Sequence, residues 1–117
     1  MMEKKIVKKP WGYEEIWAAN EKYVGKILFI KNGSKLSRQY HEVKDETIYV
    51  LDGTLLLELG KDDDMLSISM KPGDIQHVTP GLIHRFCADC GTDVKLIEVS
   101  TPELDDVVRI QDDYGRT

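Results

Sequence analysis

Glycine and proline residues divide this chain of 117 residues into short segments rich in aliphatic, β-branched and aromatic side chains. Segments of this length between turn-forming residues are typical of strands, and their regular spacing predicts an all-β sandwich or barrel. The dipeptide Asp52-Gly53 favours a hairpin turn between two of them. The expected strands cover residues 23–31, 36–41, 47–51, 54–59, 66–70, 75–79, 84–88 and 94–100.

The C-terminal part of the chain carries a different pattern. Thr101-Pro102-Glu103 places a capping residue, a proline and an acidic residue in the order that helix N-termini favour. Leu104, Val107 and Val108 would supply the apolar face of such a helix. We therefore expect a short helix or turn after the last strand.

The length and charge of the chain limit its organisation and its partners. A chain of 117 residues predicts a single domain over residues 1–117. Its net charge of -5 argues against nucleic acid as a partner, because a phosphate-binding surface needs a basic excess. No segment has the apolar length of a membrane span, and the first ten residues lack the apolar run of a signal peptide. We therefore expect a cytoplasmic protein with no membrane partner.

Four polar side chains have the arrangement of a metal site. An amide, an imidazole and a carboxylate lie within eight residues, at Gln39, His41 and Glu46, and a second imidazole, His84, follows the turn Pro80-Gly81. Side chains alternate along a strand, so that Gln39 and His41 point to the same face. A lone histidine on a strand is usually structural or exposed. The prediction of a metal site therefore depends on all four residues together. We expect them to meet inside the barrel.

This combination of ligands limits the metal and its chemistry. Imidazoles with a carboxylate suit Zn, Mn, Fe, Co or Ni. One carboxylate leaves a divalent ion with residual positive charge, and an ion with open positions then acts as a Lewis acid. Such an ion makes neighbouring hydroxyl groups more acidic, which favours proton-transfer chemistry.

The spacing of these residues resembles the two motifs of the cupin superfamily, with Gln39 in place of the first histidine of the first motif. The residues that fit the two motifs are Gly33, Gln39, His41, Glu46 and Gly53, then Gly73, Gly81 and His84. The resemblance implies a jelly-roll fold and one divalent metal ion held by Gln39, His41, Glu46 and His84.

A closer resemblance covers nearly the whole chain. It is to the C-terminal cupin domain of bifunctional type II mannose-6-phosphate isomerase/mannose-1-phosphate guanylyltransferase. The blocks that carry it are Lys9-Pro-Trp-Gly-Tyr-Glu14, Leu36-Ser37, Gln39-Tyr-His41, Asp105-Asp-Val-Val-Arg109 and Asp113-Tyr-Gly-Arg116. Because zinc phosphomannose isomerases use the same four ligand types, the resemblance favours Zn.

The chain departs from this family directly after the first ligands. The family motif continues His-His-Arg-Ala-Glu-His, whereas this chain has Glu42-Val-Lys-Asp-Glu-Thr47. The imidazoles and the arginine of this run are replaced, and Lys44 keeps the positive charge. The guanylyltransferase domain is absent from these 117 residues. The resemblance therefore supports metal binding more strongly than isomerase activity.

Four further charged residues are candidates for the site. Lys26 shares the phase of inward residues, and we interpret it as a phosphate ligand or proton donor, or else as a structural lysine in a salt bridge. Glu98 is its expected partner or a catalytic base. Arg109 and Arg116 would hold a substrate phosphate as bidentate donors, or form surface salt bridges.

The remaining reactive residues have simpler interpretations. Arg85 follows the inward His84, so alternation sends it outward to a structural or interface role. Cys87 and Cys90 form one Cys-x-x-Cys pair, and without a second pair we interpret them as free thiols at a hairpin end rather than zinc ligands. His77 lies outside the motifs, and we expect it to be non-functional.

Three functions are compatible with these residues. The first is a metal-dependent isomerase of sugar phosphates, of the mannose 6-phosphate type. The second is a non-haem Fe(II) oxygenase, which uses two histidines and one carboxylate; Gln39 as a fourth ligand argues against it. The third is a non-catalytic cupin that binds a sugar or uses metal for stability. Family habit and exposed strand edges favour a homodimer.

Overall fold

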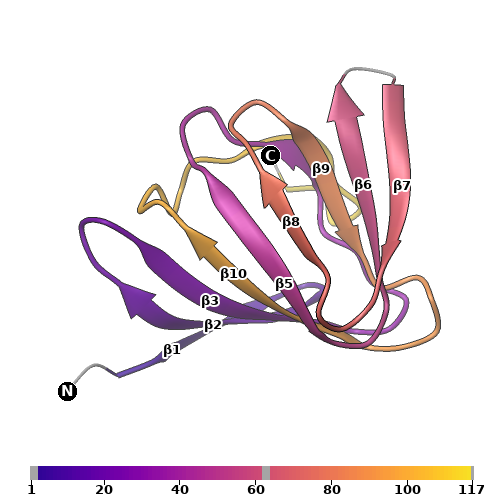
Figure 1. The fold of residues 1–117 in the computed structure, drawn as a ribbon, viewed down its shortest axis with the longest axis horizontal. Coiled ribbons are helices and arrows are strands. Elements are labelled where there is room, and N and C mark those ends of the chain that lie inside the picture. The colour runs from indigo at the N-terminus through magenta and orange to yellow at the C-terminus, as the bar shows by residue number, and fades with distance from the viewer. Residues whose placement is uncertain (1–2, 62–63, 117) are drawn as a thin grey trace.

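The computed structural model describes residues 3–61 and 64–116, whose strands form two antiparallel sheets that face each other (Figure 1). The six-stranded sheet contains, in spatial order, β1 Lys5–Lys9, β2 Gly12–Ala19, β3 Val24–Ile30, β10 Val94–Ser100, β5 Glu46–Asp52 and β8 Ile75–Val78. The five-stranded sheet contains β11 Val108–Gln111, β4 Arg38–Tyr40, β9 Ile83–Cys87, β6 Leu55–Lys61 and β7 Asp64–Met70. This arrangement confirms the predicted all-β jelly roll.

Three neighbouring strands of the six-stranded sheet carry inward rows that change from apolar to charged. The rows are Ile30, Leu28 and Lys26 in β3, Val94, Leu96 and Glu98 in β10, and Val50, Ile48 and Glu46 in β5. The register aligns them, since Leu96 lies opposite both Leu28 and Val50, and Glu98 lies opposite Lys26. The interior is therefore apolar at one end and charged at the other.

The apolar end holds the two sheets together. Leu55, Leu57 and Phe86 of the five-stranded sheet pack against the aliphatic residues of the opposite sheet in one buried cluster. Each such side chain contributes about 1.5–3 kcal/mol when it is fully buried. This packing fixes the distance between the sheets, and it thereby holds the charged end of the interior in place.

All eight strands expected from the sequence form, and the interval 94–100 matches β10 at both ends. The strands β1, β2 and β11 were not predicted. In β2 the register shifts between Ile16 and Ala18, where Trp17 is an extra residue, and this bulge interrupts the alternation that identifies a strand. The N-terminal strands extend the six-stranded sheet beyond its partner (Figure 1).

The expected C-terminal helix does not form, and the turn that was its alternative does. Residues 101–107 lie outside helices and strands, with a turn at residues 104–105, after which β11 pairs with β4 in register Arg109 with Gln39. The pattern around Pro102 offers too few residues for a helix, because so short a helix is marginal in water, whereas the free edge of β4 offers hydrogen bonds. Within residues 3–61 and 64–116, nothing helical has the length or hydrophobicity to cross a bilayer.

Gly53 closes the hairpin between β5 and β6, and it should tolerate substitution less well than Gly33 does. Its φ is 78°, and a Cβ at this position would collide with the carbonyl oxygen of Asp93. Gly33 has a similar φ of 86°, but its Cβ would meet no described heavy atom within 4 Å. We expect Gly33→Ala to cost roughly 1 kcal/mol of unfolding free energy and Gly53→Ala clearly more. Urea denaturation of both variants measures this, and equal losses would contradict it.

Candidate metal centre

Two imidazoles and one carboxylate come together at the charged end of the interior. His41 follows β4, Glu46 begins β5 and His84 lies in β9, so that the two sheets contribute different members. Their ligand atoms all lie within 4.8 Å of one another. Each residue is at most 4% exposed to solvent. The structure therefore brings together three of the four predicted metal ligands in a buried cluster.

The hydrogen bonds of the two histidines determine which ring nitrogens face the cluster. His41 Nδ1 donates to the backbone oxygen of Asp106 at 2.6 Å, and His84 Nδ1 donates to that of Leu82 at 3.0 Å. A carbonyl oxygen only accepts, so each Nδ1 carries a hydrogen. In the neutral rings both Nε2 lone pairs then point at Glu46 Oε1, from 2.8 Å for His41 and 3.3 Å for His84.

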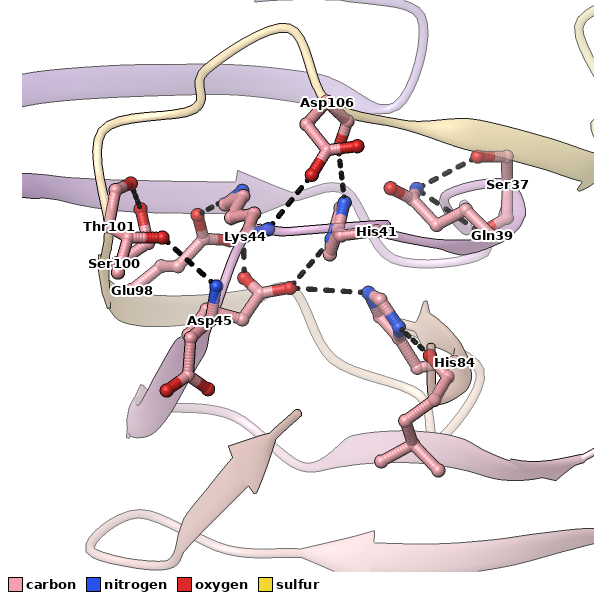
Figure 2. A network of polar contacts seen from close by, with 12 residues as sticks. Ser37, Gln39, His41, Lys44, Asp45, His84, Glu98, Ser100, Thr101 and Asp106 are labelled. Carbon is pink, nitrogen blue, oxygen red and sulfur yellow. Dashed lines mark hydrogen bonds and ion pairs between the residues drawn. The ribbon is translucent and has the colours of Figure 1, made fainter. Parts of the chain in front are cut away.

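This geometry fits a cation. Three electron-pair donors face one another in a buried space, and they need either extra protons or a metal ion between them. Histidine ligands whose second nitrogen donates to a backbone carbonyl are the usual arrangement of a protein metal site. His41 and His84 point toward the same region from opposite sides (Figure 2).

Glu46 is ionised in this environment. Burial alone would raise the pKa of its carboxyl group. In the absence of a metal ion, hydrogen bonds that protonated Nε2 atoms of His41 and His84 donate to the carboxylate outweigh burial and hold that pKa well below its usual range. Lys44 Nζ lies 3.8 Å from Glu46 Oε2 and adds to the effect. Among the described residues, Oε2 has no hydrogen-bond partner. The carboxylate therefore presents Oε1 to the two histidines, and its Oε2 can still accept a hydrogen bond or bind a metal ion.

Gln39 lines the same cavity but its position as a ligand stays a prediction. Its Nε2 donates to Ser37 Oγ at 2.8 Å, which fixes the orientation of the amide. Figure 2 shows the amide beside His41, with the nitrogen turned toward Ser37. Gln39 also lies opposite His84 in the pairing of β4 with β9. The side-chain oxygen is thus oriented away from Ser37 and is available to a metal.

A cavity of about 100 Å³ opens at this cluster. Every residue that the sequence predicted to bind metal, to act in catalysis or to bind substrate lines this cavity, and further residues line it as well. The charged and polar lining residues are Lys9, Glu14, Lys26, Ser37, Gln39, His41, Lys44, Glu46, His84, Glu98, Arg109 and Arg116. Five of these are lysine or arginine and three are glutamate, so that the wall favours a negatively charged ligand once a divalent metal is present.

The lysines and glutamates of the cavity pair differently from the expectation. Lys26 Nζ lies 3.2 Å from Glu14 Oε1, and Glu98 Oε2 lies 3.1 Å from Lys44 Nζ. Glu98 was expected to pair with Lys26, so Glu14 and Lys44 are site residues that the sequence did not assign. Glu14 was missed because its strand, β2, was not recognised. Lys44 was noted only as a charge retained from the family motif.

Arg116 and Arg109 both reach the cavity from the C-terminal segment. The Arg116 guanidinium donates from Nε and Nη2 to the two oxygens of Asp112, at 2.9 and 3.0 Å. This bidentate pair lowers the pKa of Asp112 to about 2. Arg116 therefore forms the salt bridge that was one of its two expected roles, while its role toward a substrate phosphate stays a prediction. Arg109 lies in β11, opposite Gln39.

Arg85 has a structural role, which was one of its two predicted roles. Its side chain is nevertheless buried and not exposed on the surface. It is 3% exposed, because the C-terminal segment covers it. Its Nε donates to Leu36 O at 2.8 Å and its Nη2 to Asp113 Oδ1 at 2.9 Å.

Cys87 is buried and Cys90 exposed, and both are free thiols. Burial raises the pKa of the Cys87 thiol to about 12.

The fold and the histidine-carboxylate cluster define a cupin domain with a candidate metal centre. The family model described as "Mannose-6-phosphate isomerase C-terminal" matches residues 1–112, and the chain belongs to this family. The predicted resemblance is thereby confirmed.

Among curated relatives, the chain is 30% identical over 114 residues to the xanthan biosynthesis protein XanB of Xanthomonas campestris. It is 32% identical over 113 residues to the mannose-1-phosphate guanylyltransferase ManC of Salmonella typhimurium. These matches cover 95% and 94% of the chain but only 24% and 23% of the relatives, so the chain spans about a quarter of their length. A shorter match, 30% identical over 66 residues and covering 56% of the chain and 37% of the relative, is to an acireductone dioxygenase of Sulfurihydrogenibium.

Solved structures support the fold. KdgF from Halomonas superposes with a TM-score of 0.73 at 21% sequence identity, and the match covers 89% of each chain. At this level of identity the likeness concerns the fold alone.

The two histidines of the cluster should be required for metal binding, and His77 should not. His77 is exposed and contacts Asp45 Oδ1 from its Nε2 at 2.6 Å, away from the cavity. We expect His84→Ala and Glu46→Gln to lose more Zn affinity than the roughly 10- to 100-fold that loss of an outer-shell group costs. His77→Ala should keep the affinity of the unchanged protein. Calorimetric titration of metal-free protein measures this, and an unaltered affinity in His84→Ala would contradict the site.

Glu98 should make the metal-free protein less stable as the pH rises toward neutrality. Burial, aided by the nearby Glu46 carboxylate, raises the pKa of Glu98 from 4.5 to about 7. The folded state therefore binds this proton more tightly than the unfolded state, and its contribution to stability is lost as pH rises from about 4.5 to about 7. Glu98→Gln should flatten this dependence, and Glu42→Gln at an exposed position should not. Urea denaturation across that pH range measures it; an unchanged slope in Glu98→Gln would contradict the assignment.

Proposed function

We propose that this domain is a metal-dependent sugar-phosphate isomerase of the mannose 6-phosphate type, or a close relative of one. The observation that carries the proposal is the convergence of His41, Glu46 and His84 in a cavity whose wall is rich in lysine and arginine. A metal site next to a cationic wall suits a small sugar that carries a phosphate. The family membership supports the same chemistry.

The metal would be held by Nε2 of His41, Nε2 of His84 and a carboxylate oxygen of Glu46, with the Gln39 amide oxygen as a fourth ligand. Zn is the favoured ion, and Mn, Fe, Co and Ni suit the same donors. When bound, a divalent ion supplies Lewis acidity, which polarises a carbonyl group and the hydroxyl group next to it. The buried position excludes bulk water and strengthens this effect.

A glutamate in the cavity would move the proton. Isomerisation of an open-chain aldose to a ketose takes a proton from the carbon next to the carbonyl and returns one to the former carbonyl carbon, while the proton of the neighbouring hydroxyl group passes to the former carbonyl oxygen. Glu98 suits this exchange, because a carboxyl group with a pKa of about 7 gives up and regains a proton near neutral pH. Lys44, 3.1 Å away, would stabilise the carboxylate form between the two transfers.

The substrate phosphate would lie against the cationic part of the wall. Lys26 is buried and carries its charge in the cavity beside Glu14. Arg109 and Arg116 approach from the C-terminal segment, and Lys9 from the end of β1. Of these, Lys26 combines burial with direct access to the cavity, so it is the proposed phosphate ligand or proton donor.

A second candidate function is a dioxygenase. Two histidines and one carboxylate are the ligand set of non-haem Fe(II) oxygenases, and one partial match is to an acireductone dioxygenase. Gln39 argues against it, because a fourth protein ligand would occupy a position that oxygen or substrate needs. The third candidate, a non-catalytic sugar-binding or metal-stabilised cupin, is favoured by the replacement of the family's His-His-Arg-Ala-Glu-His run with Glu42–Thr47.

The proposal covers this domain and not the remainder of its longer relatives. Guanylyltransferase activity, which the name of ManC states for that protein, is not proposed here. A homodimer, a cytoplasmic location and the absence of nucleic-acid partners stay predictions. The strand β1 forms a free edge of the six-stranded sheet and is a natural place for a second copy to pair.

The assay follows interconversion of mannose 6-phosphate and fructose 6-phosphate by metal-free protein before and after addition of Zn, Mn, Fe, Co or Ni. We expect activity only with metal. Lys26→Met should lower kcat/KM by about 10²-fold or more and leave metal affinity unchanged, because Lys26 contacts Glu14 rather than the histidines. Lys95→Met, on the outer face of β10, is the matched control.

Three results would contradict the isomerase proposal. Activity in the absence of any metal would exclude the mechanism. Oxygen consumption with Fe(II) and no isomerisation would favour the dioxygenase. A rise in melting temperature on metal addition without turnover of any sugar phosphate would favour the non-catalytic cupin.

A further inference from the structure

Asp106 contacts the loop between β4 and β5 with both its side chain and its backbone. Its carboxylate accepts hydrogen bonds from the backbone N–H groups of Glu42 at 3.0 Å, Val43 at 2.7 Å and Lys44 at 2.8 Å. Its backbone oxygen accepts the hydrogen of His41 Nδ1 at 2.6 Å. Figure 2 shows Asp106 directly beside His41 and Lys44.

These four hydrogen bonds act on one short loop. The loop from residue 41 to residue 45 lies outside the strands, so its conformation depends on such contacts. The three N–H groups that donate to this one carboxylate belong to consecutive residues, so the hydrogen bonds fix the backbone between His41 and Glu46. The hydrogen bond to Nδ1 fixes the tautomer and the direction of the His41 ring.

We propose that Asp106 is a positioning residue that orients His41 and the loop between the metal ligands, and that it thereby couples the C-terminal segment to the metal centre. The proposal concerns the metal site and does not depend on the isomerase function. Asp106 itself is not a metal ligand, because its side chain is bound to the loop backbone.

This coupling reaches the wall of the cavity. Leu104, Val107 and Arg109 lie on either side of Asp106 in the sequence, and all three line the cavity. A second contact holds the same segment, where Thr101 N donates to Asp45 O and Thr101 Oγ1 accepts from Asp45 N, both at 3.0 Å. By linkage, a metal that fixes His41 also stabilises the docked segment, and the docked segment strengthens metal binding by the same factor.

The test compares Asp106→Ala and Asp106→Asn with Asp105→Asn. Asp105 is exposed and adjacent, and it carries the same charge. We measure Zn affinity by competition with a chromogenic chelator, and hydrogen exchange of the backbone amides with and without Zn. Asp106→Asn keeps the shape and one acceptor oxygen, so it remains informative where Asp106→Ala fails to fold.

We expect Zn affinity to fall by about 10- to 100-fold in Asp106→Ala, less in Asp106→Asn, and not at all in Asp105→Asn. Zn should slow amide exchange at residues 42–44 and 104–109 in the unchanged protein, and should no longer slow it at 104–109 in the Asp106 variants. A merely structural residue would lower stability without removing this response. Unchanged Zn affinity in both Asp106 variants, or the same Zn-dependent protection of residues 104–109, would overturn the proposal.

Discussion

The buried contact of two imidazoles with one carboxylate is the interaction on which the candidate metal centre depends. Backbone carbonyls of Asp106 and Leu82 take the Nδ1 hydrogens, so both Nε2 atoms face Glu46 Oε1 at 2.8 and 3.3 Å. Such a group of donors is costly to bury without a cation. The two sheets hold it in place through the apolar layer beneath it, in which the aliphatic rows of β3, β10 and β5 pack on the opposite sheet.

The charged end of the interior is better explained by function than by stability. Buried Lys26 pairs with the half-buried Glu14, and Lys44 and Glu98 form a buried pair, next to the ionised Glu46. Buried ion pairs seldom stabilise a protein more than apolar side chains of the same size would, because each charge loses its hydration. Clusters of ionisable groups in a cavity, with a carboxyl group whose pKa is raised, are instead typical of sites that bind ions or move protons.

The sequence predicted the site residues that share the spacing of the two motifs and missed residues that reach the site from elsewhere in the chain. His41, Glu46 and His84 follow from motif spacing and from the alternating faces of strands, and the structure brings them together. Glu14 and Asp106 could not be found in this way. Glu14 lies on β2, where a bulge at Trp17 interrupts the pattern, and Asp106 reaches the loop across more than 60 residues of sequence. Eight strands were likewise predictable, whereas β11 forms because β4 offers it a free edge.

The chain belongs to a family named for mannose-6-phosphate isomerase, and its ligand cluster is the feature from which every functional proposal above begins. The most direct test of this account is the metal content of the protein purified without added metal, measured by elemental mass spectrometry and repeated after incubation with Zn, Mn, Fe, Co or Ni and removal of the excess. The account predicts about one transition-metal ion per chain, because residues 3–61 and 64–116 contain one such cluster, formed by His41, Glu46 and His84. A protein that remains free of metal after every incubation would contradict it.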